Sequence, residues 1–138
     1  MEISNIRVDA AKIEAGDWVA VDDLFPMLEG VRLKVRGTGN ADYRRLHGKK
    51  TRKIAAQRLG PEKEQAAEWQ MTNELLVETI LLDWDGLSMD NKALPYTPEI
   101  AAQFLADPEM RFLRDAVIYA GNLVATRKKG AGDEAEKN

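Results

Sequence analysis

Residues 78–104, ETILLDWDGLSMDNKALPYTPEIAAQF, connect two segments that have strong helical patterns. The apolar residues near the start of this stretch, Ile80–Leu82, are expected to form the end of the preceding helix. Asp83–Gly86 then breaks the pattern with an Asp-Gly turn, because glycine adopts positive φ without a steric penalty. Thr97–Glu99 predicts the next helix start, with a threonine N-cap, a proline at the first position and an acid in the first turn. The stretch is therefore predicted to join two helices through a turn anchored by Trp84 and Tyr96.

Four helices are predicted around this connection. They cover residues 41–59 after the N-cap Asn40, residues 61–84, residues 98–106, and residues 108–126 after an Asp-Pro start. The second helix has the clearest apolar stripe, with three- and four-residue spacing. The members of that stripe are Ala66, Trp69, Leu76, Val77, Ile80, Leu81 and Trp84. We expect the whole stripe to be buried in the core.

The N-terminal part of the chain is predicted to form strands and loops. Val31–Arg36 alternates strictly between apolar and basic residues, which is the pattern of a strand with one buried face. Trp18–Val21 has a strand-like composition, and Asn5–Val8 is expected to form another short strand. A sheet of two or three antiparallel strands follows from these segments, and it needs helices to cover its apolar face.

The predicted fold class is α+β and mostly helical, with a small N-terminal antiparallel β element followed by a bundle of about four helices. We predict a single domain over residues 1–127, β-rich over 1–37 and helical over 38–127. Residues 128–138 have no apolar side chain larger than alanine and are predicted to be a disordered tail.

The composition excludes several kinds of site. The chain has no cysteine, so it has neither a disulfide nor a thiolate metal site, and His47 is its single histidine. The N-terminus lacks the basic and apolar regions of a signal peptide. No apolar run approaches the roughly 18 residues that cross a bilayer. We therefore expect a protein of the cytoplasm that has no contact with a membrane.

No pattern of a catalytic or ligand site is met. The acidic cluster between Asp83 and Asn91 would place Ser88 where an EF-hand loop needs glycine and Leu94 where it needs glutamate. Gly37–Gly39 is not followed by the lysine of a phosphate-binding loop. Most acids lie at helix starts and in turns. We therefore predict that the protein is not an enzyme, takes no small-molecule substrate and holds no metal or cofactor.

Charge is distributed very unevenly along the chain. The net charge is −3, yet Arg32–Arg58 contains ten basic residues and one acid, which gives +9 and leaves −12 for the remainder. The basic residues of the predicted helix are Arg44, Arg45, Lys49, Lys50, Arg52 and Lys53. Three interpretations of this face are open: it is a solvated surface, it contacts an acidic protein, or it contacts nucleic acid. Nucleic acid is the least favoured, because only Tyr43 adds an aromatic ring and no known nucleic-acid-binding motif is present.

Several motifs together resemble the tail assembly chaperones of long-tailed bacteriophages. The first is K-x-E-x-G-x-W-V at residues 12–19, which leads to a basic strand at 31–36. An apolar segment ending in D/G-W-D/E-G lies at residues 83–86, and P-Y/F-T/S-P-E lies at 95–99. A short helix and a long C-terminal helix close the pattern, at 100–105 and 108–126, so that the resemblance spans most of residues 10–126.

The resemblance implies a helper protein made in the cytoplasm of the bacterial host. Such a chaperone binds the long helical tape measure protein, keeps it soluble and recruits tail tube subunits around it. We expect partner contacts at the basic face and at the large side chains off the core stripe, Met71, Ile118 and Tyr119. Self-association into a homo-oligomer is left open. Two alternatives remain. One is a small nucleic-acid-binding regulator that uses residues 32–58. The other is a structural head–tail or tail-completion protein, and finding the chain in purified virions would favour it.

Overall fold

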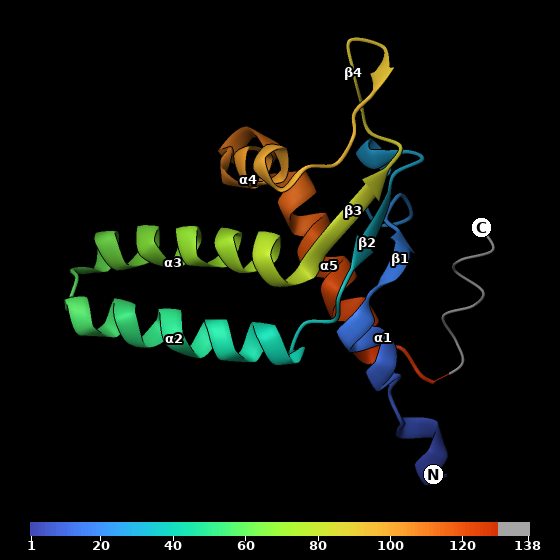
Figure 1. Ribbon diagram of the computed structural model, residues 1–138, viewed down its shortest axis with the longest axis horizontal. Coiled ribbons are helices and arrows are strands. Elements are labelled where there is room, and N and C mark those ends of the chain that lie inside the picture. The colour runs from blue at the N-terminus through green and yellow to red at the C-terminus, as the bar shows by residue number, and fades with distance from the viewer. Residues whose placement is uncertain (130–138) are drawn as a thin grey trace.

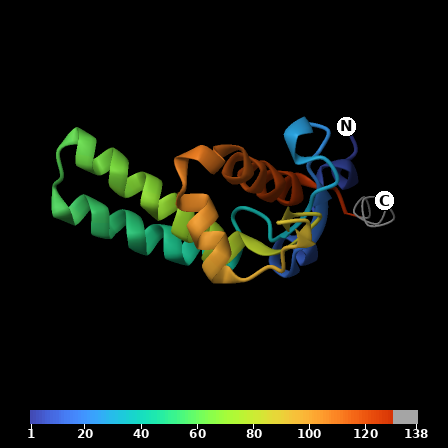
Figure 2. The same cartoon turned by 90° about the horizontal axis from the view of Figure 1, so that it is seen from above.

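The computed structural model of the protein describes residues 1–129. The fold is α+β and mostly helical, which confirms the predicted class. A small antiparallel sheet lies against the long helix α5 (Arg111–Thr126). Helices α2 (Ala41–Gln57) and α3 (Pro61–Leu75) form a hairpin that projects away from the sheet (Figure 1). Viewed from above, α5 runs along one face of the sheet while the hairpin extends to the other side of the molecule (Figure 2).

The main sheet has three strands in the order β1 (Asp17–Ala20), β2 (Arg32–Val35) and β3 (Leu81–Asp85). The first two confirm the predicted strands at 18–21 and 31–36. The third corrects the prediction, because these residues were assigned to the end of the helix at 61–84. That helix ends at Leu75, continues as a single π-helical turn, η3 (Leu76–Ile80), and then enters β3.

The third strand forms because its backbone pairs with β2. Leu33 lies opposite Trp84 and Arg32 lies opposite Asp85 in an antiparallel register. An apolar run of this length fits a helix end or a buried strand equally well by periodicity alone. The sheet is therefore not built only from residues 1–37, and one strand belongs to the segment that was predicted to be helical.

The N-terminal segment also differs from its prediction. Residues 5–8 do not form a strand of the main sheet. A 3-10 turn, η1 (Ile3–Ile6), is followed by a short helix, α1 (Ala10–Ala15). Val8 and Lys128 form an isolated antiparallel bridge, so order extends to the start of the predicted tail. Residues 130–138 of that tail lie outside the described part of the chain.

The predicted polar turn after β3 contains a small hairpin of β4 (Ser88–Met89) and β5 (Lys92–Ala93). The two residues between these strands, Asp90 and Asn91, both have positive φ, as a two-residue type I′ turn requires. Trp84 Nε1 donates to the carbonyl oxygen of Leu94 at 2.8 Å. The ring of Tyr96 meets the Trp84 ring edge-on at 4.9 Å, so the two aromatic residues anchor this connection as predicted.

The core lies between the sheet and the C-terminal helices. One face of the sheet contributes the buried Val19, Leu33 and Val35, and α5 contributes a buried stripe opposite them. That stripe consists of Leu113, Ala116, Val117, Ala120 and Val124. Helix α4 (Pro98–Ala106), which begins where the sequence predicted, buries Ala101 and Leu105. A 3-10 turn, η4 (Pro108–Met110), leads from α4 into α5.

The apolar stripe of the helix predicted at 61–84 is only partly buried. Leu76, Ile80 and Trp84 lie in the core, whereas Ala66 and Trp69 are exposed. The exposed half lies on the projecting hairpin, where the sheet does not reach (Figure 1). Helix α2 has no buried residue at all. The expectation that the whole stripe packs in the core is therefore wrong for its first two turns.

Candidate partner-binding surfaces

The α2–α3 hairpin is attached to the body through Asn40, which is fully buried. Its side-chain oxygen accepts a hydrogen bond from the Tyr43 amide at 2.9 Å and caps α2 as predicted. Its Nδ2 donates to the carbonyl oxygens of Gly37 at 3.0 Å and Thr79 at 2.8 Å. One amide side chain therefore joins the loop after β2, the start of α2 and the end of η3.

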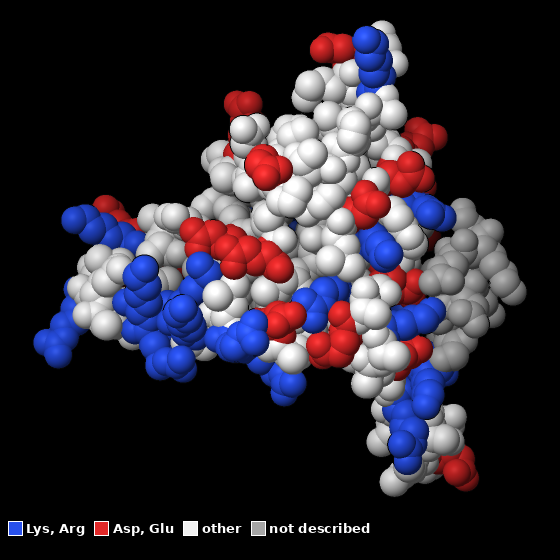
Figure 3. All heavy atoms as spheres, in the orientation of Figure 1, with Lys and Arg blue, Asp and Glu red and all other residues white. Residues whose placement is uncertain are grey.

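The hairpin separates charge between its two helices. Helix α2 contains six Lys and Arg residues and one Asp, whereas residues 61–80 of α3 and η3 contain five Glu and one Lys. Figure 3 shows basic side chains gathered along α2 and a row of acidic side chains on the α3 side. The two helices are joined by an ion pair between Lys50 Nζ and Glu74 Oε2 at 2.5 Å. Part of the basic segment is thus neutralised within the hairpin itself.

The predicted basic face is for the most part a continuous exposed surface. Arg44, Lys49, Arg52 and Lys53 are exposed and form no ion pair within residues 1–129. Arg45 is also exposed and pairs with Asp42 one turn earlier at 2.9 Å. Lys50 differs from these, because it is half-buried and turned towards α3. We call the surface formed by these five exposed residues, without Lys50, the α2 basic face.

Two carboxyl groups next to this face are held in the charged form. The hydrogen bond from the Arg36 guanidinium, 2.8 Å away, lowers the pKa of Asp42. The hydrogen bond from Lys50 lowers the pKa of Glu74, although partial burial acts in the opposite direction. Arg36 Nε also donates to the carbonyl oxygen of Glu14 at 2.7 Å, so it ties α1 to the start of the hairpin.

Of the three predicted apolar contact residues, Met71 lines a small hollow with Lys53 of the α2 basic face, whereas Ile118 and Tyr119 pack against the core. Met71 is half-buried between the two hairpin helices, with its sulfur 3.8 Å from the Thr51 hydroxyl. Ile118 and Tyr119 are half-buried against the core, and the Tyr119 ring packs edge-on against Phe25 at 5.9 Å. All three are less exposed than predicted, because their neighbours on α2 and on the loop after β1 cover them.

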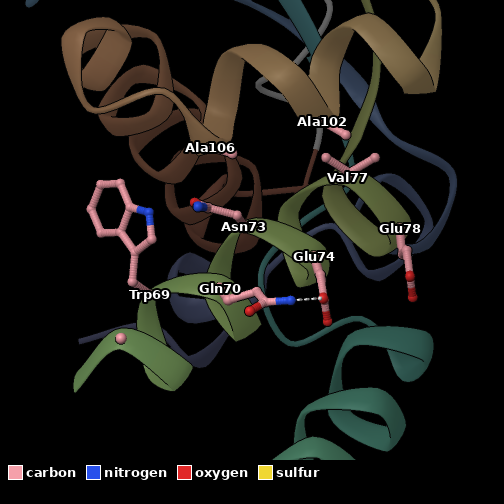
Figure 4. Close-up of a pocket in the computed structure, with 9 residues that line it drawn as sticks. Trp69, Gln70, Asn73, Glu74, Val77, Glu78, Ala102 and Ala106 are labelled. Carbon is pink, nitrogen blue, oxygen red and sulfur yellow. Dashed lines mark hydrogen bonds between the residues drawn. The ribbon is translucent and has the colours of Figure 1, made fainter. Parts of the chain in front are cut away.

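A groove of about 500 Å³ lies between α3 and α4. Figure 4 shows Trp69 at one end and Glu78 at the other, with Ala106 and Ala102 of α4 facing them. The remaining lining residues are Ala66, Gln70, Asn73, Glu74 and Val77. Its lining is mostly apolar, and acidic side chains lie along one edge. Sequence reasoning missed this groove, because the stripe that lines it had been assigned to the core.

Arg114 of α5 holds the Trp69 wall of the groove in place. Its guanidinium carbon lies 3.9 Å from the centre of the Trp69 ring, in cation–π geometry. Its Nε donates to Oδ1 of the buried Asn73 at 2.7 Å. Burial lowers the pKa of Arg114, but a guanidinium stays protonated in proteins. Trp69, 37% of which is exposed, is therefore a fixed aromatic surface.

Two classes of site are not found in the part of the chain that the structure describes. No group of three or more His, Cys, Asp or Glu side chains within residues 1–129 is placed to hold a metal ion. No helix among these residues has both the length and the apolar character needed to cross a membrane. The surfaces that remain as candidates are the α2 basic face and the α3–α4 groove.

Comparison with known proteins gives one finding. The family model described as YdaY prophage protein matches residues 38–138, about three quarters of the chain. The matched part begins just before the hairpin and includes both candidate surfaces. No curated protein and no solved structure gives a significant match.

Proposed function

We propose that this chain, which belongs to the YdaY prophage protein family, is a tail assembly chaperone. In this role it binds the tape measure protein of its prophage in the host cytoplasm, keeps it soluble and recruits tail tube subunits, without catalysing a reaction. The prophage family supports the viral setting of the proposal. The motifs at residues 12–19, 83–86 and 95–99 support the tail-assembly role through their resemblance to such chaperones.

The observation that carries the proposal is the open apolar groove between α3 and α4. A long helical protein with apolar stripes aggregates unless those stripes are covered. A groove between two helices covers an apolar stripe by helix-in-groove contact. The groove lies between α3 of the projecting hairpin and α4, and Figure 1 shows α3 leading away from the three-stranded sheet.

The α2 basic face supports a second contact with an acidic surface of a partner. Surface charge of one sign raises association rates and aligns a complementary partner more than it adds affinity. Reversal of Arg44, Arg45 and Lys49 to glutamate should therefore slow association with the tape measure protein, with the larger effect at low salt. Lys50 is left out of this variant, because its loss would break the ion pair with Glu74.

The test is co-expression of this chain with the tape measure protein of the same prophage. We expect the soluble fraction of the tape measure protein to rise and the two chains to co-purify. The matched control is expression of the tape measure protein alone at the same level. A tape measure protein that stays insoluble and does not co-purify would refute the proposal.

A nucleic-acid-binding regulator is the second candidate, and the α2 basic face favours it. Its exposed cations lie on one helix without ion pairs for most of them. Binding to duplex DNA or RNA with an affinity that falls steeply with salt would support this candidate. Binding that is weak at low salt and unchanged by reversal of Arg44 and Arg45 would exclude it.

A further inference from the structure

We propose that the α3–α4 groove is the docking site for one amphipathic helix of a partner protein, and that this helix carries Lys or Arg beside its apolar stripe. The inference deepens the proposed function, on which it rests for the source of the helix. It assigns the main contact to the groove, with the α2 basic face in a secondary role. Shape, the fixed aromatic wall and the charge of the edge each support it.

The shape of the groove fits a helix. Its walls are two helices, and small side chains line the α4 wall, where Ala102 and Ala106 are both exposed. Small side chains allow another backbone to approach closely. The facing wall runs from Ala66 of α3 to Glu78 of η3, which is about 18 Å at the rise of an α-helix and equals roughly three turns of a docked helix.

One wall of the groove has the features of a binding anchor. Trp69 is a large aromatic residue that Arg114 already holds in one orientation, so little side-chain freedom is lost when a partner binds. Tryptophan is among the residues that contribute most to protein interfaces. An aliphatic side chain of the partner would therefore lie between Trp69 and Ala106, and a second one turn later would contact Val77 and Ala102.

The edge of the groove selects a basic partner. Glu74 and Glu78 lie along it one turn apart, and Glu78 is exposed with no ion pair among the described residues. Lys50 neutralises Glu74, so the free negative charge of this edge is that of Glu78, which lies at the opposite end of the groove from Trp69 and its Arg114 cation. A docked helix with Lys or Arg on this flank gains charge complementarity, whereas an acidic helix is repelled.

The α2 face of a second copy is a poorer occupant than a partner helix. It is basic, which suits the acidic edge, but its fully exposed apolar residues are alanines, Ala41, Ala55 and Ala56. Such a face cannot fill a groove of about 500 Å³. The occupant must bring larger apolar side chains along with its positive charge.

The experiment uses two synthetic amphipathic peptides of about 18 residues, one of leucine and lysine and one of leucine and glutamate. Their binding to the full chain is measured by isothermal titration calorimetry. We expect the lysine peptide to bind at least about tenfold more tightly than the glutamate peptide. Ala102→Trp, which fills the groove from an exposed position, should weaken binding of the lysine peptide by about tenfold or more.

The matched control is Ala56→Trp, the same substitution at an exposed site on α2 away from the groove. It should leave binding of the lysine peptide unchanged. Glu78→Lys is a second variant, which should reverse the preference between the two peptides without filling the groove. Equal binding by wild type and Ala102→Trp, no preference between the peptides, or no binding of either peptide would overturn the proposal.

The same variants separate this inference from the proposed function. If the tape measure protein co-purifies equally with wild type and Ala102→Trp, the chaperone function stands and the groove is not the site. If the lysine peptide binds in the groove but the tape measure protein is not rescued, the groove stands and the chaperone function fails. Sedimentation tests the third case. If the wild type self-associates and Ala102→Trp abolishes that association, a second copy is the occupant and the proposal is overturned.

Discussion

Replacement of Asn40 by alanine should destabilise the protein by about 3 kcal/mol, although the residue is neither apolar nor charged. The loss of an N-cap side chain typically costs about 1 kcal/mol. Asn40 also donates two buried hydrogen bonds, to Gly37 at 3.0 Å and Thr79 at 2.8 Å. Each of these contributes about 1 kcal/mol, and more where an acceptor is left without a donor. The sum is a large share of the stability of an ordinary domain.

The assay is equilibrium unfolding in urea, followed by tryptophan fluorescence. With the slope typical of small proteins, a loss of about 3 kcal/mol lowers the midpoint by about 1–3 M. Thr97→Ala is the matched control, because the Thr97 hydroxyl also caps a helix, with a hydrogen bond of 3.1 Å from the Ile100 amide. Thr97 is only half-buried and its hydroxyl caps this helix alone, so its loss should cost about 1 kcal/mol.

A third variant separates capping from the buried donors. Asn40→Asp keeps an acceptor for the Tyr43 amide but loses both N–H donors and places a carboxylate opposite two carbonyl oxygens. Burial and these oxygens should raise the pKa of the new carboxyl in the folded state. Its destabilisation should then be largest at neutral pH and should shrink as the pH falls and the group becomes a donor. If Asn40→Ala costs no more than Thr97→Ala and Asn40→Asp is tolerated at pH 7, Asn40 does not anchor the hairpin.

Three further perturbations test other parts of the fold. The hydrogen bond from Lys50 lowers the pKa of Glu74, so the stabilisation is present above the unfolded-state pKa and is lost as the pH falls through the folded-state value. Glu74→Gln should cost at most about 1 kcal/mol at neutral pH because water still reaches this half-buried pair, and urea titrations should show that difference shrinking below about pH 5. Burial raises the pKa of Tyr96, so spectrophotometric titration should show a phenol that ionises above about pH 10, and Tyr96→Phe should remove that late step. Gly86 has a φ of +91° and a Cβ there would lie 2.3 Å from the carbonyl oxygen of Gly30, so Gly86→Ala should cost more than about 2 kcal/mol and lower the thermal midpoint seen by circular dichroism.

Features that depend on neighbours in the sequence were predicted correctly. The caps at Asn40 and Thr97 involve amides three residues ahead, and the structure contains both hydrogen bonds. The alternating segment at 31–36 contains β2, with Leu33 and Val35 buried. In each case the side chain and its partner lie within a few residues, so the local pattern carries enough information.

Features that depend on distant pairing were not predicted. Whether residues 81–85 continue a helix or form a strand is decided by the pairing of Trp84 with Leu33, about fifty residues earlier. The groove has the same origin. Ala66 and Trp69 have the spacing of core residues, and they remain open because of where α4 packs. A helical stripe in the sequence shows which face is apolar, but it does not show what covers that face.

The arrangement of charge in the fold makes the α3–α4 groove a stronger candidate for the main partner contact than the α2 basic face. The basic segment at 32–58 stands out in the sequence, yet in the fold Lys50 is bound by Glu74, Arg45 by Asp42, and Arg36 by Asp42 and Glu14. The cations of α2 that form no ion pair among the described residues, Arg44, Lys49, Arg52 and Lys53, are on a solvated helix face, where charge affects the rate of encounter and the salt dependence more than the affinity. The groove instead combines a held tryptophan, small side chains and an acidic edge, which are the features that determine how long a complex lasts. Raising the salt concentration should therefore slow association with a partner while the dissociation rate stays nearly constant. Substitutions in the groove should instead raise the dissociation rate while the association rate stays nearly constant.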